Sequence, residues 1–166
     1  MNTHDGRAAL GSAIRRLVPL GDEELSTVTA AYSPQRVSRK DMLQQAGEVN
    51  DHEWFVVKGC LRTFFIDEKG KEVTLSFAPE GWWVGDLASF SQRMPSRFFI
   101  QALEDTELLA IRSADKERLF TEVPKLERAF RLEQFLEQLD DLEQTCGTQF
   151  RGGAHAATEQ PLRESL

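Results

Sequence analysis

The chain has 166 residues with a formal net charge of −7 at pH 7, and 40 % of its residues are hydrophobic. That size favours one compact domain with a helical extension over two full domains. The negative charge argues against a bare nucleic-acid-binding module, because contacts to phosphates need a basic face. The N-terminus lacks the apolar core of a signal peptide and the apolar runs are too short for a membrane span, so we expect a cytoplasmic protein.

Two helices are expected before the first strand. In an N-terminal segment of residues 1–20, the stretch Ala8–Val18 could form one helix. A second helix is expected to begin at Asp22, whose side chain can cap free amides, and to end before Pro34. The second helix would be the first element of a domain that we place at residues 21–123.

Short β-like runs follow, rich in Val, Ile, Phe, Thr and Leu and separated by glycines. The expected strands are Glu53–Lys58, Cys60–Ile66, Lys71–Phe77, Arg97–Leu103 and Glu107–Arg112. Many short strands at this spacing predict a mainly β fold, an antiparallel β jelly roll with flanking helices.

The C-terminal part is expected to be helical and then disordered. Ser113 would cap a brief helix through Phe120, and Pro124 would begin a long helix over residues 124–146. That helix carries a heptad seam, which predicts either a homodimer or packing on its own barrel; the seam residues are Leu132, Phe135, Leu139 and Leu142. The tail, residues 147–166, is polar and glycine-containing, and we expect it to be disordered.

One stretch suggests a ligand site. A strand is expected to end at Gly85, and a short helical turn to run from Asp86 to Phe90. Such a turn exposes unpaired amides at its beginning, which can hold a phosphate. Asp86 could cap those amides or accept a hydrogen bond from a ligand hydroxyl.

This stretch resembles the phosphate-binding cassette of cyclic-nucleotide-binding domains, in which Gly-Glu-Leu precedes a helical turn and an Arg-Ser or Arg-Thr/Ala pair follows. The resemblance extends to the strand pair Phe55–Arg62 and to the hairpin Asp67–Glu72. From about Gly21 to Gln144 the chain therefore resembles the sensor domain of Crp/Fnr-type cyclic-nucleotide-binding regulators. The resemblance implies a jelly roll with N-terminal helices and a long C-terminal helix that dimerises two subunits.

The family also implies roles for the cassette residues. Gly85 and Leu87 would be structural, and the acid, here Asp86, would bind the ribose 2′-hydroxyl of cyclic AMP or cyclic GMP. Counted forward from the cassette, the family's phosphate-binding arginine falls on Ser96 and its neighbour on Arg97. A length change in the loop before them could bring Arg97 into the arginine's place, but a shift by one residue turns a side chain to the opposite face.

The expected function is a small-ligand-sensing regulatory domain, with a ligand-free interaction or dimerisation module as the alternative. In the family a winged helix-turn-helix follows the long helix, and the twenty tail residues are too few for it, so direct DNA binding is not expected. An enzyme is not expected either, because no histidine lies in a plausible site for a nucleophile or a cupin-type metal. Two cysteines are also too few for an iron–sulfur cluster. We predict no metal site.

Overall fold

Two four-stranded antiparallel sheets form the centre of the protein. The structure is a computed structural model that describes residues 3–131. In the first sheet the strand order is β1-β8-β3-β6, and in the second it is β2-β7-β4-β5. The first sheet consists of β1 (Ser33–Val37), β8 (Thr106–Arg112), β3 (His52–Lys58) and β6 (Trp83–Val84). The second consists of β2 (Met42–Gln44), β7 (Phe99–Ala102), β4 (Leu61–Ile66) and β5 (Glu72–Ala78). This arrangement confirms the mainly β jelly-roll fold.

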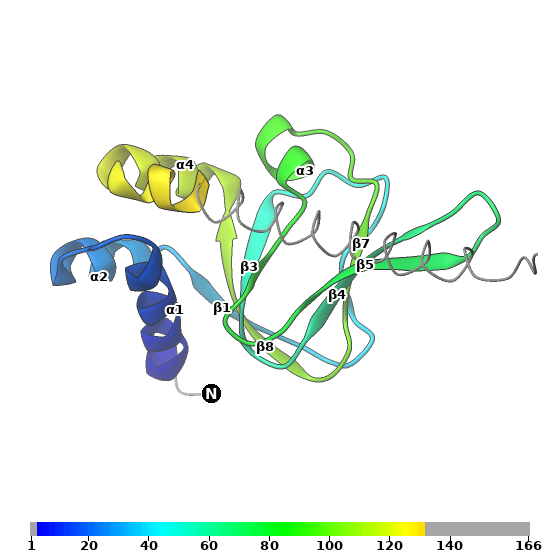
Figure 1. Ribbon diagram of the computed structural model, residues 1–166, viewed down its shortest axis with the longest axis horizontal. Helices are drawn as coiled ribbons and strands as arrows, with labels where there is room; N and C mark the ends of the chain where they lie inside the picture. Colours follow the sequence, from blue (N-terminus) through cyan, green and yellow to red (C-terminus); the bar gives the residue numbers. More distant parts are fainter. Residues whose placement is uncertain (1–2, 132–166) are drawn as a thin grey trace, which may run out of the picture.

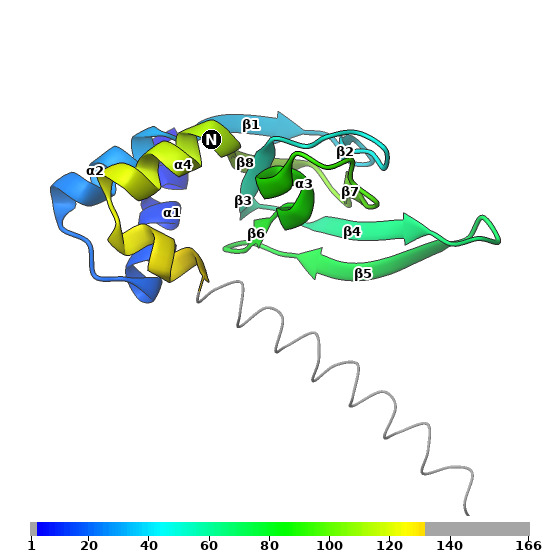
Figure 2. The ribbon, with the colours of Figure 1, turned by 90° about the horizontal axis from the view of Figure 1, so that it is seen from above.

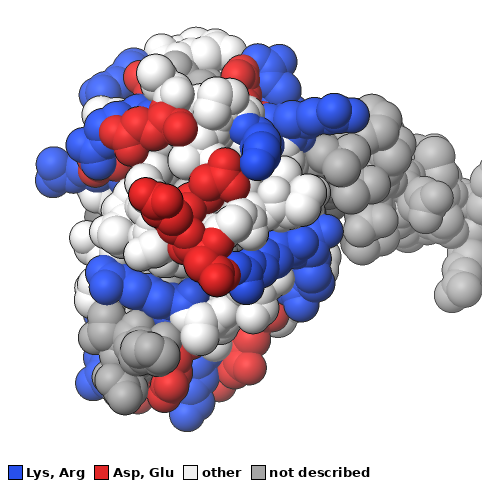
Figure 3. Space-filling view, turned by 90° about the vertical axis from the view of Figure 1, so that its left-hand side faces the viewer, with Lys and Arg blue, Asp and Glu red and all other residues white. Residues whose placement is uncertain are grey.

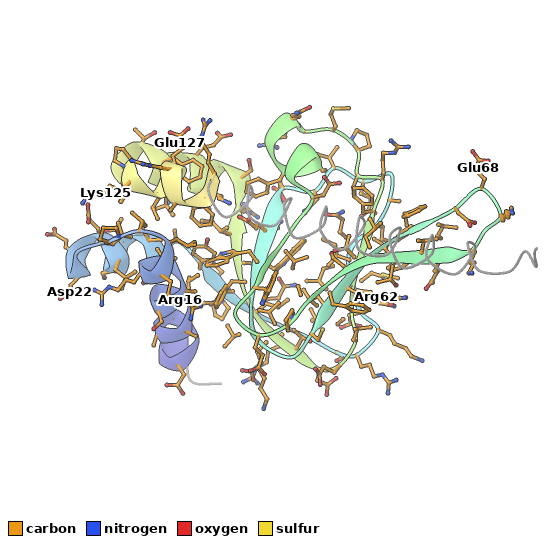
Figure 4. All side chains as sticks on the ribbon, viewed as in Figure 1. Arg16, Asp22, Arg62, Glu68, Lys125 and Glu127 are labelled. Carbon is orange, nitrogen blue, oxygen red and sulfur yellow. The ribbon has the colours of Figure 1, made fainter. Side chains whose placement is uncertain are left out.

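Helices cover one end of the sheets. They are α1 (Thr3–Leu17), α2 (Asp22–Ala30), α3 (Leu87–Gln92) and α4 (Ser113–Glu122), followed by a helical segment over residues 125–131. Figures 1 and 2 show α1, α2 and α4 gathered at the end where β1 and β8 lie, while the β4–β5 hairpin extends the opposite way. Glu68 marks the far tip of that hairpin in Figure 4.

The first sheet buries both of its faces, which explains its dense apolar composition. Along β3, Trp54 and Val56 point into the space between the two sheets, whereas Phe55 points to the helices. Along β8, Leu108 and Leu109 alternate in the same way. Successive side chains of a strand point to opposite faces, so one strand can serve two cores.

The protein has two hydrophobic cores, one on each face of the first sheet. The core between the sheets contains Trp54, Val56, Leu61, Ala78, Val84, Ile100, Ala102, Leu108 and Ala110. The second core joins the helices to the outer face of the first sheet; its large members include Leu10, Ile14, Tyr32, Phe55, Trp83, Leu109, Leu126 and Phe130. Helices α1, α2 and α4, Trp83 of β6 and the segment 125–131 therefore share one apolar core.

The expected strands are present with shifted ends, and the two-residue β6 is the strand expected before the helical turn, ending at Val84 rather than Gly85. Two strands had not been expected, β1 and the three-residue β2. The second helix ends at Ala30 rather than before Pro34, and Pro34 lies in β1. Because β1 is an edge strand, its proline removes no needed hydrogen bond from the sheet.

The expected cap of the second helix was also wrong. Gly21 is the N-cap residue and Asp22 is the first helical residue. Instead, Glu24 reaches back, and its Oε2 accepts a hydrogen bond of 3.0 Å from the amide of Gly21. Ser113 is likewise the first residue of α4 rather than its cap.

Charges of both signs are interspersed at the helical end. Figure 3 shows a band of acidic side chains there between groups of basic ones. Lys125, the first residue of the segment 125–131 and labelled in Figure 4, forms an ion pair of 3.2 Å with Glu24 of α2. Arg131 and Glu127 form another, of 2.6 Å. This face therefore presents paired charges rather than a basic surface.

Some of the expectations fall outside the described residues. The predicted seam, Leu132, Phe135, Leu139 and Leu142, lies beyond residue 131, as does the tail 147–166. The domain boundaries and the dimer therefore stay predictions. No helix in the described part of the chain is long and apolar enough to cross a membrane.

Candidate functional site: a cassette with serine opposite the acid

The cassette begins where β6 ends. Trp83 is buried against the helices, whereas the neighbouring Trp82 is 45 % exposed. Gly85 follows β6 and lies against β3, since a methyl group there would sit 3.5 Å from Cγ of Glu53. Leu87 is the first residue of α3. The expected helical turn after Gly85 is thus present.

Asp86 is buried and caps the turn. Its Oδ1 accepts a hydrogen bond of 3.2 Å from the amide of Ser89. Its Oδ2 accepts one of 2.6 Å from the hydroxyl of Ser96. An amide at the start of a helical turn is thereby satisfied by a carboxylate of the same chain.

Ser96 is 4 % exposed and is held from both sides. Its Oγ, whose proton goes to Asp86, accepts hydrogen bonds from Nε2 of Gln44 at 2.5 Å and from the amide of Phe98 at 3.0 Å. The same Nε2 donates to the carbonyl of Phe98 at 3.1 Å, which fixes the orientation of the Gln44 amide. Gln44 Oε1 is buried and has no hydrogen-bond partner in the described structure.

Two further contacts fix α3. The hydroxyl of Ser89 accepts a hydrogen bond of 2.8 Å from the amide of Asn50 in the loop before β3. The hydroxyl of Ser113, at the beginning of α4, donates one of 3.0 Å to the carbonyl of Phe90. The cassette is therefore tied to β3 and α4 by buried polar groups.

The structure gives Ser96 and Arg97 different positions. The amide of Ser96 donates to the carbonyl of Glu48 and its carbonyl accepts from the amide of Gly47, both at 2.8 Å. This pairing fixes the segment with Ser96 inward and Arg97 exposed. The arrangement brings Gly85, Asp86 and Ser96 together at the start of α3, but it does not bring Arg97 to them.

The electrostatics of the cassette differ from those that a phosphodiester needs. The groups that donate hydrogen bonds to Ser96, namely the side-chain amide of Gln44 and the backbone amide of Phe98, are uncharged. A buried phosphodiester is bound best by a permanently charged bidentate donor such as a guanidinium. In this chain, position 96 instead holds a serine whose hydroxyl donates a hydrogen bond to the carboxylate of Asp86.

Gln44, Asn50 and Ser89 were not expected in the site. Gln44 lies on the three-residue strand β2, which pairs with β7 through an irregular register. No local pattern marks it, because its role depends on a pairing between segments 52 residues or more apart.

Sequence comparison agrees with this geometry. Residues 34–122, more than half of the chain, match the family described as the cyclic nucleotide-binding domain. The chain belongs to that family. The family is one of regulatory sensor domains, and the resemblance to Crp/Fnr-type regulators is confirmed.

A curated relative is the cAMP-activated global transcriptional regulator CRP of Salmonella typhimurium. It is 29 % identical over 72 residues, which is 43 % of this chain and 34 % of that protein. The match thus spans about a third of the regulator's length.

Two solved structures share the fold. The catabolite activator protein of Thermus thermophilus superposes with a TM-score of 0.68 at 22 % identity, covering 82 % of this chain and 63 % of that chain. The regulatory subunit of a cAMP-independent protein kinase A from Trypanosoma cruzi, bound to guanosine, gives 0.63 at 14 % identity, with coverages of 91 % and 53 %. At these identities the likeness concerns the fold alone.

Proposed function

We propose that this cyclic nucleotide-binding domain is a regulatory sensor of the Crp/Fnr type that does not bind its ligand through a cyclic phosphate. The observation that carries the proposal is the hydrogen bond of 2.6 Å between Ser96 and Asp86. In the family's cassette these two positions hold the phosphate-binding arginine and the ribose-binding acid. In this chain the two side chains bond each other.

Loss of the arginine removes the main attraction for a cyclic nucleotide. A charged bidentate hydrogen bond is roughly twice as strong as a neutral one. The carboxylate of Asp86 would also repel a phosphate placed next to it, without a neighbouring guanidinium to compensate. Arg97 supplies no substitute, because it is exposed on the other side of the segment.

One buried atom of the cassette favours a ligand-binding domain over a ligand-free interaction module. Gln44 Oε1 is a buried acceptor without a partner in the described structure, and such groups are costly to leave unpaired. A ligand that brings a hydrogen-bond donor would satisfy it. The ligand class that fits these groups is uncharged and rich in donors, such as a polyhydroxylated molecule, rather than an anion.

The test compares a cyclic nucleotide with its nucleoside. Calorimetric titration of the chain with cyclic AMP and with adenosine measures what the phosphate adds to affinity. We expect no gain from the phosphate, and we expect Arg97→Ala to change neither titration. Cyclic AMP or cyclic GMP bound at micromolar Kd, and at least tenfold more tightly than the nucleoside, would overturn the proposal.

The wider roles of the family are also proposals for this chain. We expect a cytoplasmic protein that forms a homodimer through the long helix predicted for residues 124–146. We expect no direct binding to DNA, and the paired charges of the helical end in Figure 3 support this expectation for that face. Regulation would pass through the partner subunit or through another protein.

A further inference from the structure

A buried ion pair lies directly behind the cassette. Lys116 of α4 pairs with Glu53 of β3, and their side chains are only 5 % and 15 % exposed. By contrast, Arg118 and Glu122, which form another ion pair in α4, have side chains 57 % and 46 % exposed. A lysine this deeply buried needs a specific reason, because desolvation of both charges opposes the pair.

The ammonium group of Lys116 also contacts three aromatic rings on three different elements. It lies 4.0 Å from the ring centroid of Phe130 in the segment 125–131, and 5.4 Å from that of Phe90 in α3. The ring of Phe120, in α4 itself, is 5.9 Å away. Cations are attracted to the faces of aromatic rings at these distances, and more strongly when water is excluded.

The pair touches the cassette at both of its ends. Glu53 packs against Gly85, where the cassette begins, and Phe90 lies near the end of its helical turn. On the opposite side, Phe130 also packs edge-on against Trp83, the residue two before Gly85, at 5.8 Å between ring centroids. One charged pair thus sits between the cassette and the start of the C-terminal helical segment.

We propose that the Glu53–Lys116 pair is a latch that couples the position of α3 to that of the segment 125–131. Motion of Phe90 would change the surroundings of the ammonium group, which also holds Phe130. Two apolar side chains could fill the same space, but they would lack the directional bond that fixes one arrangement of the two elements. The inference goes beyond the proposed sensing function, since it requires no particular ligand.

The test is a double-mutant comparison by hydrogen–deuterium exchange of the full chain without ligand. Phe90→Ala perturbs α3, and exchange is followed at the amides of residues 125–131. In the natural background we expect exchange there to rise about fivefold or more. With Glu53→Leu and Lys116→Met together, we expect Phe90→Ala to cause no further rise at those amides.

Two additional backgrounds make the result decisive. Arg118→Met with Glu122→Leu removes the exposed pair of the same helix and should leave the effect of Phe90→Ala intact. Glu53→Gln with Lys116→Gln keeps size and polarity without charge, should fold if the apolar pair does not, and should also abolish the effect. An equal rise in every background, or no rise in the natural one, would overturn the latch. Because no ligand is used, this outcome is independent of the titration with nucleotides.

Discussion

Ser96 donates its hydroxyl proton to Oδ2 of Asp86 at 2.6 Å, inside a cassette that in related domains places an arginine opposite the acid. A guanidinium at this position can bind an anionic ligand. A serine hydroxyl that donates to the carboxylate satisfies the hydroxyl and the carboxylate with no ligand bound. We propose that this relationship gives the domain a different ligand chemistry from that of its relatives. Its consequences for stability and binding can be measured.

Ser96→Ala removes the hydroxyl that donates a hydrogen bond to Asp86 and accepts one from Gln44. Buried polar groups left unpaired cost about 1–3 kcal/mol, so we expect the free energy of unfolding to fall by that amount. Denaturant titration measures the change. The matched control is Ser76→Ala on the exposed part of β5, which should stay within about 0.5 kcal/mol. Equal small effects of both substitutions would show that the Ser96 network contributes nothing.

Gly59→Ala should be strongly destabilising. Gly59 has φ of +100°, and a methyl group on it would lie 2.5 Å from Oγ1 of Thr106. Backbone strain together with the displaced side chain predicts a loss of about 3 kcal/mol. Gly70→Ala is the control, because Gly70 has φ of +78° but nothing within 4 Å of that position. It should cost about 1 kcal/mol from the backbone alone. Similar losses at the two positions would contradict the close approach to Thr106.

The buried ion pair predicts an unusual order of stabilities. Lys116→Met alone leaves the carboxylate of Glu53 buried without its cation, and we expect a loss of about 3–5 kcal/mol. Adding Glu53→Leu should recover most of it, because two apolar side chains avoid desolvation of charge. Thermal or denaturant unfolding of the three proteins measures this order. A double variant less stable than the single one would mean that the pair itself stabilises the fold.

Glu24 should titrate below the ordinary range of a glutamate side chain. The hydrogen bond from the amide of Gly21, and then the contact with Lys125, lower the pKa of Glu24 from its ordinary value of 4.5. A lowered folded-state pKa favours the carboxylate, so this contribution to stability is present above the unfolded value and is lost as pH falls through the folded one. NMR titration of the carboxyl carbon of Glu24 measures its pKa. Lys125→Met should move the pKa of Glu24 only part of the way back, because the amide bond remains.

The thiol of Cys60 should react slowly with alkylating reagents. Burial, and secondly the nearby charge of Glu104, raise the pKa of this thiol above its ordinary value. Less thiolate is therefore present at pH 8, and the thiolate is the reactive form. Mass mapping after iodoacetamide treatment should show slower labelling of Cys60 in the folded chain than in urea. Equal rates in both conditions would contradict the raised pKa.

The sequence predicted what depends on local pattern, and it missed what depends on register. Alternating apolar residues and glycine turns were sufficient for β3, β4, β5 and β8. The placement of Ser96 at the arginine's position followed from counting along the cassette. The strands β1 and β2 were missed, because β1 contains Pro34 and only one partly buried residue, and β2 has only three residues.

The polar partners of the cassette could not be found in the same way. Gln44 reaches Ser96 only because β2 pairs with β7, and Lys116 reaches Glu53 across 63 positions of the chain. From the sequence alone, a lysine in a helix is expected to have a solvated side chain. Lys125 follows this expectation, with a side chain that is 58 % exposed. Only the tertiary packing of Phe90, Phe120 and Phe130 around it reveals that Lys116 is buried.

The most direct test of the central claim is to restore the arginine. Ser96→Arg, alone and with Asp86→Glu, is titrated with cyclic AMP by calorimetry beside the natural chain, after circular dichroism has verified that each variant is folded. The account predicts that cyclic AMP binds at least one of the folded arginine variants at micromolar concentrations but not the natural chain. Micromolar binding by the natural chain, or no binding by either folded variant, would contradict it.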